Sequence, residues 1–156
     1  MEKHWLWIGA GVLGLLFLGN EVKTMTGTAR GFRNNNPGNI RFSTKNNWQG
    51  QIGKDKDGFV IFDTPLNGLR ASAKLIKNKL NKGQSTIAAL IESWAPPNEN
   101  NTPAYVAAVA KALGVSSSAS LNATHIPGLL NAIIKHENGS NPYPVTLIQQ
   151  AIAAIG

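Results

Sequence analysis

Glu137, in the segment "IIKHENGSNPY", is the residue of this 156-residue chain best placed to do chemistry. The apolar run before it predicts a helix over residues 126–137. On a wheel of ~100° per residue, Glu137 falls about 40° from Ile133, inside the apolar stripe. The C-terminal end of a helix carries the negative end of its dipole. Burial and the dipole both disfavour a charged carboxylate, so this position suits a general acid.

A structural explanation of this position is the alternative: the last turn frays, and Glu137 turns to solvent or pairs with a lysine. The other acids are weaker candidates. Glu92 lies about 130° from the apolar stripe of its predicted helix and should face solvent. Glu99 lies in the loop "PPNENN", whose direction the sequence does not predict, and it is the alternative catalytic residue. The remaining acids after the first 30 residues occupy turn or capping positions: Asp55, Asp57 and Asp63.

Other catalytic chemistries lack the residues or the spacing that they need. The histidines, at positions 4, 125 and 136, have no metal-ligand spacing. The chain has no cysteine, which excludes disulfides and thiolate chemistry. It contains neither a nucleophile elbow nor a phosphate-binding loop. We therefore expect carboxylate chemistry that needs no metal and no cofactor.

The formal net charge of +7 is carried beyond the first 23 residues, because the charges up to Lys23 cancel. A basic surface suits a polyanionic partner such as nucleic acid, an anionic membrane or a bacterial cell wall. The lysines are scattered and no nucleic-acid-binding motif is present, so we expect no specific nucleic acid partner.

The segment "WLWIGAGVLGLLFLG", residues 5–19, has no charge and predicts an N-terminal transmembrane helix. It would rise ~22 Å, less than the ~30 Å hydrocarbon core of a bilayer, so we expect a short single-span anchor with Trp5 and Trp7 at the interface. A core helix and a cleaved signal peptide are the alternatives. The predicted domains are an anchor at 1–22, a linker at 23–31 and a catalytic domain at 32–156.

The catalytic domain, roughly 130 residues, is long enough for one core. Thr64 and Pro65 form an N-cap and first-turn proline pair, and Leu66, Leu69 and Ala73 begin a helical apolar face. "GKDKDG", between two apolar stretches, predicts a β-hairpin. The fold class is therefore mainly α, an α+β arrangement of five helices with one small β-hairpin. The predicted helices start at Thr64, at Ser85 or Thr86, at Thr102, at Ile126 and at Pro144.

Several segments together resemble a group of phage and prophage proteins. These proteins are described either as virion structural proteins or as lysozyme-like peptidoglycan-degrading enzymes. The resemblance covers roughly Arg30 to the C-terminus, and it is carried by "RGFRNNNPGNIR", "WQG", "GFVIFDTPLNGLRA", "WAPPNENNTPAYV" and "IIKHENGSNPY". The combination is specific, although no single segment would be.

The same pieces, in another order, are similar to those of bacterial glucosaminidases and lytic transglycosylases. Those enzymes carry the catalytic acid on a helix that ends in Glu-Ser-Gly, and the glucosaminidases continue with an Asn-rich stretch, Trp-x-Gly, a β-hairpin and a helix. Here Glu137-Asn138-Gly139 follows these pieces instead, and Asn138 replaces the serine. We infer a circularly permuted lysozyme-like core, since the termini of compact domains often lie close together. The loop at residues 33–41 should then lie against the end of the 126–137 helix.

The resemblance implies a muralytic enzyme that cleaves the β-1,4-glycosidic backbone of peptidoglycan with Glu137 as the catalytic acid. Glycoside hydrolysis usually needs two carboxylates. Only one acid here is predicted on a buried helical face, which favours a lytic transglycosylase, where a substrate hydroxyl replaces water. Both tryptophans among the candidates also suit core positions. The candidates for binding sugar or positioning Glu137 are Asn36, Asn39, Trp48, Trp94 and Tyr105.

Other functions remain open: a peptidoglycan endopeptidase on the same scaffold, a non-catalytic virion membrane structural protein, and a basic membrane-tethered DNA-binding protein. The expected partners are peptidoglycan glycan strands, a lipid membrane through residues 5–19, and other virion proteins. The expected location is the virion membrane or the host inner membrane, with the C-terminal domain exposed.

Overall fold

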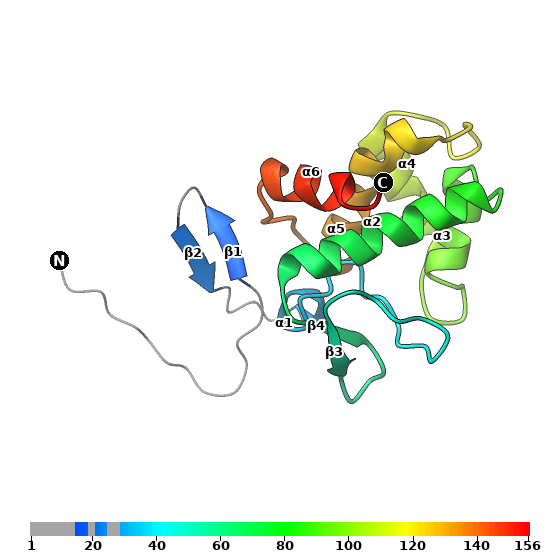
Figure 1. The fold of residues 1–156 in the computed structure, drawn as a ribbon. Coiled ribbons are helices and arrows are strands. Elements are labelled where there is room, and N and C mark those ends of the chain that lie inside the picture. Colours follow the sequence, from blue (N-terminus) through cyan, green and yellow to red (C-terminus); the bar gives the residue numbers. More distant parts are fainter. Residues whose placement is uncertain (1–14, 19–20, 25–28) are drawn as a thin grey trace.

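Helix α5 (Ile126–Asn138) lies at the centre of the fold, in contact with α2, α4 and α6. The computed structural model describes residues 15–18, 21–24 and 29–156, and these ranges contain six α-helices and two small antiparallel sheets. Figure 1 shows α2 crossing the body with α6 along it. The predicted mainly helical class is confirmed. The other long helices are α2 (Pro65–Asn81), α3 (Ile87–Trp94), α4 (Thr102–Leu113) and α6 (Val145–Ala153).

The helix starts follow the capping residues of the sequence, with one shift. The side chains of Thr64 and Thr86 each accept a hydrogen bond from the backbone amide three residues on, as expected of an N-cap. Helix α4 begins at Thr102, as predicted, but the residue that caps it is Asn101, one position earlier. Thr102 is buried, and its hydroxyl donates to the carbonyl oxygen of Ala95 at 2.8 Å. That bond ties the end of α3 to the start of α4, so the threonine is not free to cap.

The hydrophobic core has a large helical part and a small part under the hairpin. The small cluster consists of Ile40, Val60, Phe62 and Ala71, and Trp48 packs against it. The large cluster joins all five long helices, which explains the period of three and four residues in their apolar positions. Its fully buried members include Leu69, Ile76, Leu90, Leu129, Leu130, Ile133 and Ile134.

The predicted β-hairpin is confirmed as β3 (Gln51–Lys54) paired with β4 (Val60–Phe62). Its turn is organised by Asp55, whose Oδ1 accepts from the backbone amides of Asp57 at 3.0 Å and Phe59 at 2.9 Å. Its Oδ2 accepts from Asn34 Nδ2 at 2.7 Å. Burial raises the pKa of Asp55, but these hydrogen bonds and the Arg30 charge outweigh it, so the pKa lies below its ordinary value.

Asp55→Ala should lower the free energy of unfolding by about 1–3 kcal/mol, because it leaves the buried amide of Asn34 without its partner. The folded-state pKa of Asp55 is depressed, so its contribution is complete above the ordinary value of 3.8 and is lost as pH falls through the folded-state pKa. Urea unfolding should therefore separate the variant from the native chain at pH 7 and much less near pH 2.

Asp57→Ala is the matched control for this turn. Asp57 is exposed, and its carboxylate pairs with the exposed Lys56, at 4.0 Å. Its removal should change stability by less than about 0.5 kcal/mol. Equal destabilisation by the two substitutions would contradict the role given to Asp55.

The region before residue 34 differs from the sequence prediction. A short helix, α1 (Arg30–Arg33), starts inside the predicted linker, and a second sheet pairs β1 (Leu15–Leu18) with β2 (Glu21–Thr24). Four residues are too few to show a helical period, and a short apolar run does not separate strand from helix. Helix α1 forms because Phe32 packs into the main core.

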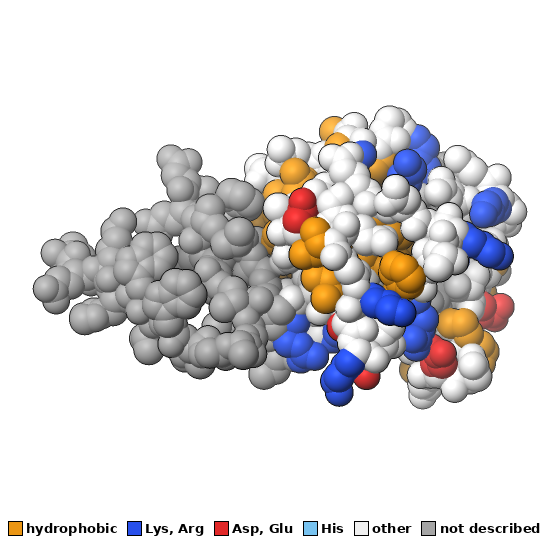
Figure 2. All heavy atoms as spheres, turned by 60° about the horizontal axis from the view of Figure 1, so that its bottom comes forward, with side chains coloured by type: hydrophobic (Ala, Val, Ile, Leu, Met, Phe, Trp, Pro, Cys, Tyr) orange, Lys and Arg blue, Asp and Glu red, His pale blue; other side chains and the backbone are white. Residues whose placement is uncertain are grey.

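The predicted transmembrane helix falls mostly on residues outside the described ranges, namely 1–14 and 19–20. The part of it that is described, Leu15–Leu18, is strand rather than helix. Among the described helices, none combines the length and the apolar character needed to span a membrane. On the face drawn in Figure 2, the Lys and Arg side chains stand in several separate groups rather than in one continuous patch.

Candidate active site

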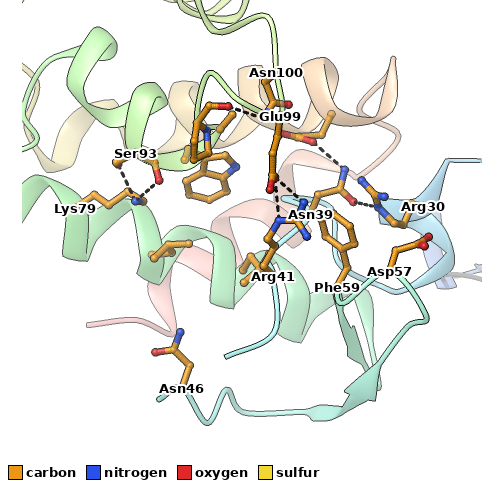
Figure 3. Close-up of a pocket in the computed structure, with 16 residues that line it drawn as sticks. Arg30, Asn39, Arg41, Asn46, Asp57, Phe59, Lys79, Ser93, Glu99 and Asn100 are labelled. Atoms are coloured by element: carbon orange, nitrogen blue, oxygen red, sulfur yellow. Dashed lines mark hydrogen bonds and ion pairs between the residues drawn. The ribbon is translucent and has the colours of Figure 1, made fainter. Parts of the chain in front are cut away.

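Glu137 lines a cleft of about 630 Å³ that lies between the helices and the hairpin side of the molecule. Figure 3 shows this cleft, which also takes in Glu99, so both acids considered from the sequence line one space. The cleft is lined by parts of α1, α2, α3 and α5, the loop at residues 34–50, the hairpin and the loop at residues 95–101. Sequence positions nearly 100 residues apart therefore contribute to a single site.

The Asn-rich loop after α1 forms the wall beside Glu137. Asn35 and Asn39 have positive φ angles of 49° and 48°, a backbone region that asparagine tolerates better than other side-chain-bearing residues. Asn36 is fully buried, and its amide bonds the backbone of Ile40 and Val60 at 2.9 Å. The "NNNPGN" stretch is thus a rigid scaffold whose last asparagine presents its side chain to Glu137.

Two donors hold the Glu137 carboxylate. Asn39 Nδ2 donates to Oε2 at 2.9 Å, and the Tyr105 hydroxyl donates to Oε1 at 2.9 Å. Tyr105 is buried in α4, and burial, followed by the neighbouring Glu137, raises the pKa of its hydroxyl well above the usual range. The hydroxyl therefore remains a donor at all working pH values. His136 stacks on the Tyr105 ring, with 3.7 Å between the ring centroids.

The predicted contact between the Asn-rich loop and the end of α5 is confirmed by the Asn39–Glu137 bond. Asn138 adds a second link, because its Nδ2 donates to the carbonyl oxygen of Pro37 at 2.8 Å and to that of Ile134 at 3.0 Å. The side chain of Asn138 thus fastens the loop to the helix end. Glu137 itself is half-buried, whereas the two residues before it, Lys135 and His136, are exposed.

The cationic side of the cleft is built around Phe59. The guanidinium of Arg30 lies 3.5 Å from the ring centroid and that of Arg41 lies 4.5 Å from it. Arg30 Nε also donates to Asn39 Oδ1 at 3.4 Å, which orients the amide so that its nitrogen faces Glu137. Arg41 pairs with Glu99, with 2.6 Å between Nη2 and Oε2. In Figure 3 the ring lies between the two arginines.

Comparison with known proteins assigns the chain to a family. No protein-family model matches it. Over 146 residues, which cover 91% of this chain and 89% of the relative, it is 36% identical to Protein P5 of Pseudoalteromonas phage PM2. The chain belongs to the Protein P5 family. The phage part of the sequence resemblance is therefore confirmed, while the name Protein P5 states no activity.

The structure of this Protein P5 relative brings together only part of the predicted site. Glu137, Glu99, Asn39 and Trp94 line the cleft, and the Trp94 indole donates to the carbonyl oxygen of Gly38 at 3.2 Å. Tyr105 lies behind Glu137 as a positioning residue rather than at the cleft surface. Two other predicted substrate-binding residues, Asn36 and Trp48, lie outside the cleft lining and instead pack into or beside the small hydrophobic cluster.

The sequence prediction missed the cationic residues of the cleft. Arg30, Arg41 and Lys79 line the cleft together with Phe59. The one available signal was the spacing of Asn39 and Arg41, because alternate residues of an extended segment point to the same side. Within the described ranges, no three His, Cys, Asp or Glu side chains gather as a metal site would require.

Proposed function

We propose that this member of the Protein P5 family is a muralytic enzyme that cleaves the β-1,4-glycosidic backbone of bacterial peptidoglycan. The observation that carries the proposal is the placement of Glu137, held from both sides by Asn39 and Tyr105 and open to a cleft of about 630 Å³. A single carboxylate in fixed geometry beside a substrate-sized cleft is the arrangement that general acid–base catalysis of glycoside cleavage requires. In this proposal the protein is a virion component tethered to a membrane by residues 5–19.

Glu137 would transfer a proton twice. It would first protonate the glycosidic oxygen as the bond from that oxygen to the anomeric carbon breaks. It would then accept the proton of a hydroxyl on the same sugar, whose oxygen attacks the anomeric carbon and closes an anhydro ring. Each carboxylate oxygen has a second lone pair beside the one used by Asn39 or Tyr105, so Glu137 can carry the proton without leaving its place.

The transglycosylase form is favoured over hydrolysis by the state of the other acids that line the cleft. A glycoside hydrolase usually needs two carboxylates, the second of which activates water or attacks the sugar. Two other carboxylates line this cleft: that of Glu99 is engaged by Arg41, and that of Asp57 lies in the exposed hairpin turn, 4.0 Å from Lys56 Nζ. The loop-to-helix contact expected of a permuted lysozyme-like core also supports the proposal.

A non-catalytic virion structural protein is the second candidate. It is favoured by the family assignment, because the matched relative is a phage protein whose name states no enzyme. The bonds of Glu137 to α4 and to the Asn-rich loop would then serve only to join these elements. An endopeptidase on the same scaffold is a third outcome, distinguished by its products.

Digestion of purified cell walls by the full-length chain tests these candidates. We expect soluble fragments ending in anhydro-sugars, identified by mass spectrometry. New reducing ends would indicate a hydrolase, and new amino groups would indicate an endopeptidase. Intact walls after prolonged incubation with folded protein would leave the structural role as the better proposal.

Tyr105→Phe should lower kcat for wall degradation by about tenfold, because it removes one of the two bonds that fix Glu137. The KM should change little, since Tyr105 lies outside the cleft lining. Kinetics on soluble glycan fragments would measure both constants, and urea unfolding would show whether the fold is kept. A rise in KM without a change in kcat would contradict the positioning role.

A further inference from the structure

Arg41 and Asn39 lie at alternate positions of one segment and bind the two glutamates of the cleft. Asn39 donates to Glu137, and Arg41 contacts Glu99 Oε2 through both Nε, at 3.2 Å, and Nη2, at 2.6 Å. Arg41 also forms an isolated antiparallel bridge with Phe59, so its backbone is fixed to the hairpin. A ligand group that took the place of Glu99 on Arg41 would therefore lie at a fixed distance from Glu137 along the cleft.

The Arg41–Glu99 pair is open to solvent and to solutes. The two side chains are 53% and 43% exposed. Exposed ion pairs of this kind contribute little to stability, so a competing anion can displace one partner at low cost. Arg41 would not lose its position when Glu99 leaves, because its guanidinium rests over the Phe59 ring, 4.5 Å from the centroid.

The other cations of the cleft donate their hydrogen bonds to neutral groups, although the charge of Arg30 also acts on Asp55. Arg30 stacks over Phe59 and donates to Asn39, and Lys79 donates to the hydroxyl of Ser93 at 2.7 Å and to its carbonyl oxygen. Within the described residues, Arg41 is the cleft cation that already binds a carboxylate. Glu99 Oε2 shows where such a group fits, and a guanidinium edge can take a carboxylate through two parallel bonds.

We propose that Arg41 is a carboxylate receptor and that the cleft selects a glycan whose sugars carry carboxylates over a neutral one. This inference rests on the proposed function and narrows its substrate class. In the free protein Glu99 occupies the receptor. When the glycan binds, one of its carboxylates displaces Glu99 from Arg41, and no covalent bond changes. The segment that carries Asn39 and Arg41 then fixes the distance between that sugar and Glu137.

Calorimetric titration on a Glu137→Gln background tests this, because that substitution prevents turnover. The probes are peptide-free peptidoglycan strands and the same strands with their carboxylates reduced to alcohols. We expect the native strand to bind at least about tenfold tighter. Arg41→Gln should remove this preference by weakening the native strand alone. Glu99→Gln should strengthen binding of the native strand by about twofold to fivefold, because the internal competitor is gone.

Lys111→Gln is the charge-matched control, since Lys111 is exposed on α4, outside the cleft. It should leave the preference intact. Equal affinity for the two strands, no binding of either, or weaker native-strand binding in Glu99→Gln would overturn the inference. If the two strands bind equally and the unmodified chain still degrades walls, the inference fails but the proposed enzymatic function stands. Arg41-dependent preference in a chain that cuts no wall would instead refute the proposed enzymatic function.

Discussion

Glu137→Gln is expected to reduce wall degradation by at least ~100-fold, the lower end of what a general acid contributes. Glutamine keeps the shape of the side chain, and its amide oxygen can still accept from Asn39 or Tyr105. It cannot deliver a proton to a leaving oxygen. The fold should persist, because the substitution replaces a half-buried acid by a neutral group of the same size. Turbidity loss of a cell-wall suspension measures the rate, and urea unfolding measures the fold.

Two further substitutions decide what a loss of activity means. Glu92→Gln should keep full activity, because Glu92 is exposed on α3 and lies outside the cleft. Glu99→Gln separates the roles of the two glutamates of the cleft. If Glu99→Gln abolishes degradation while Glu137→Gln retains it, the helical wheel selected the wrong acid. If all three variants stay active, the single-carboxylate mechanism must be abandoned.

Gly68→Ala is expected to destabilise the protein by about 3 kcal/mol or more, at the upper end for overpacking. A Cβ at Gly68, in α2, would overlap with the Asn35 carbonyl oxygen and would lie 2.8 Å from the Asn35 carbonyl carbon and 2.9 Å from Pro37 Cδ. These are backbone and ring atoms that cannot swing aside. The Asn-rich loop would have to move off α2, and Asn39 would lose its register with Glu137. Urea unfolding and wall degradation should therefore both be impaired.

Gly128→Ala is the matched control, for which we expect the opposite effect on stability. Gly128 is exposed in α5, and the nearest atom to an added Cβ would be Leu113 Cγ, at 3.5 Å, an ordinary contact. An alanine there should stabilise the protein by about 0.5–1 kcal/mol through better helix propensity. Similar unfolding curves for the two variants would contradict the claim that the Asn-rich loop rests directly on α2.

The sequence by itself determined the parts of this protein that depend on local patterns. The caps at Thr64 and Thr86, the hairpin around Asp55 and the central apolar stripe of α5 follow from turn chemistry and helical periodicity, which act over a few residues. The same wheel placed Glu137 on the inner face. Short elements without a full period, such as α1, left no comparable signal.

Only the tertiary structure decided which residues share the cleft with Glu137. Arg41 and Glu99 are 58 positions apart, and Asn39 and Glu137 are 98 apart, so no local pattern links them. The resemblance predicted that the Asn-rich loop lies beside α5. It did not distinguish Asn36, which bonds the backbone inside the loop and hairpin, from Asn39, which bonds Glu137 in the cleft. That difference arises because the packed core and the hairpin together fix which way each amide points.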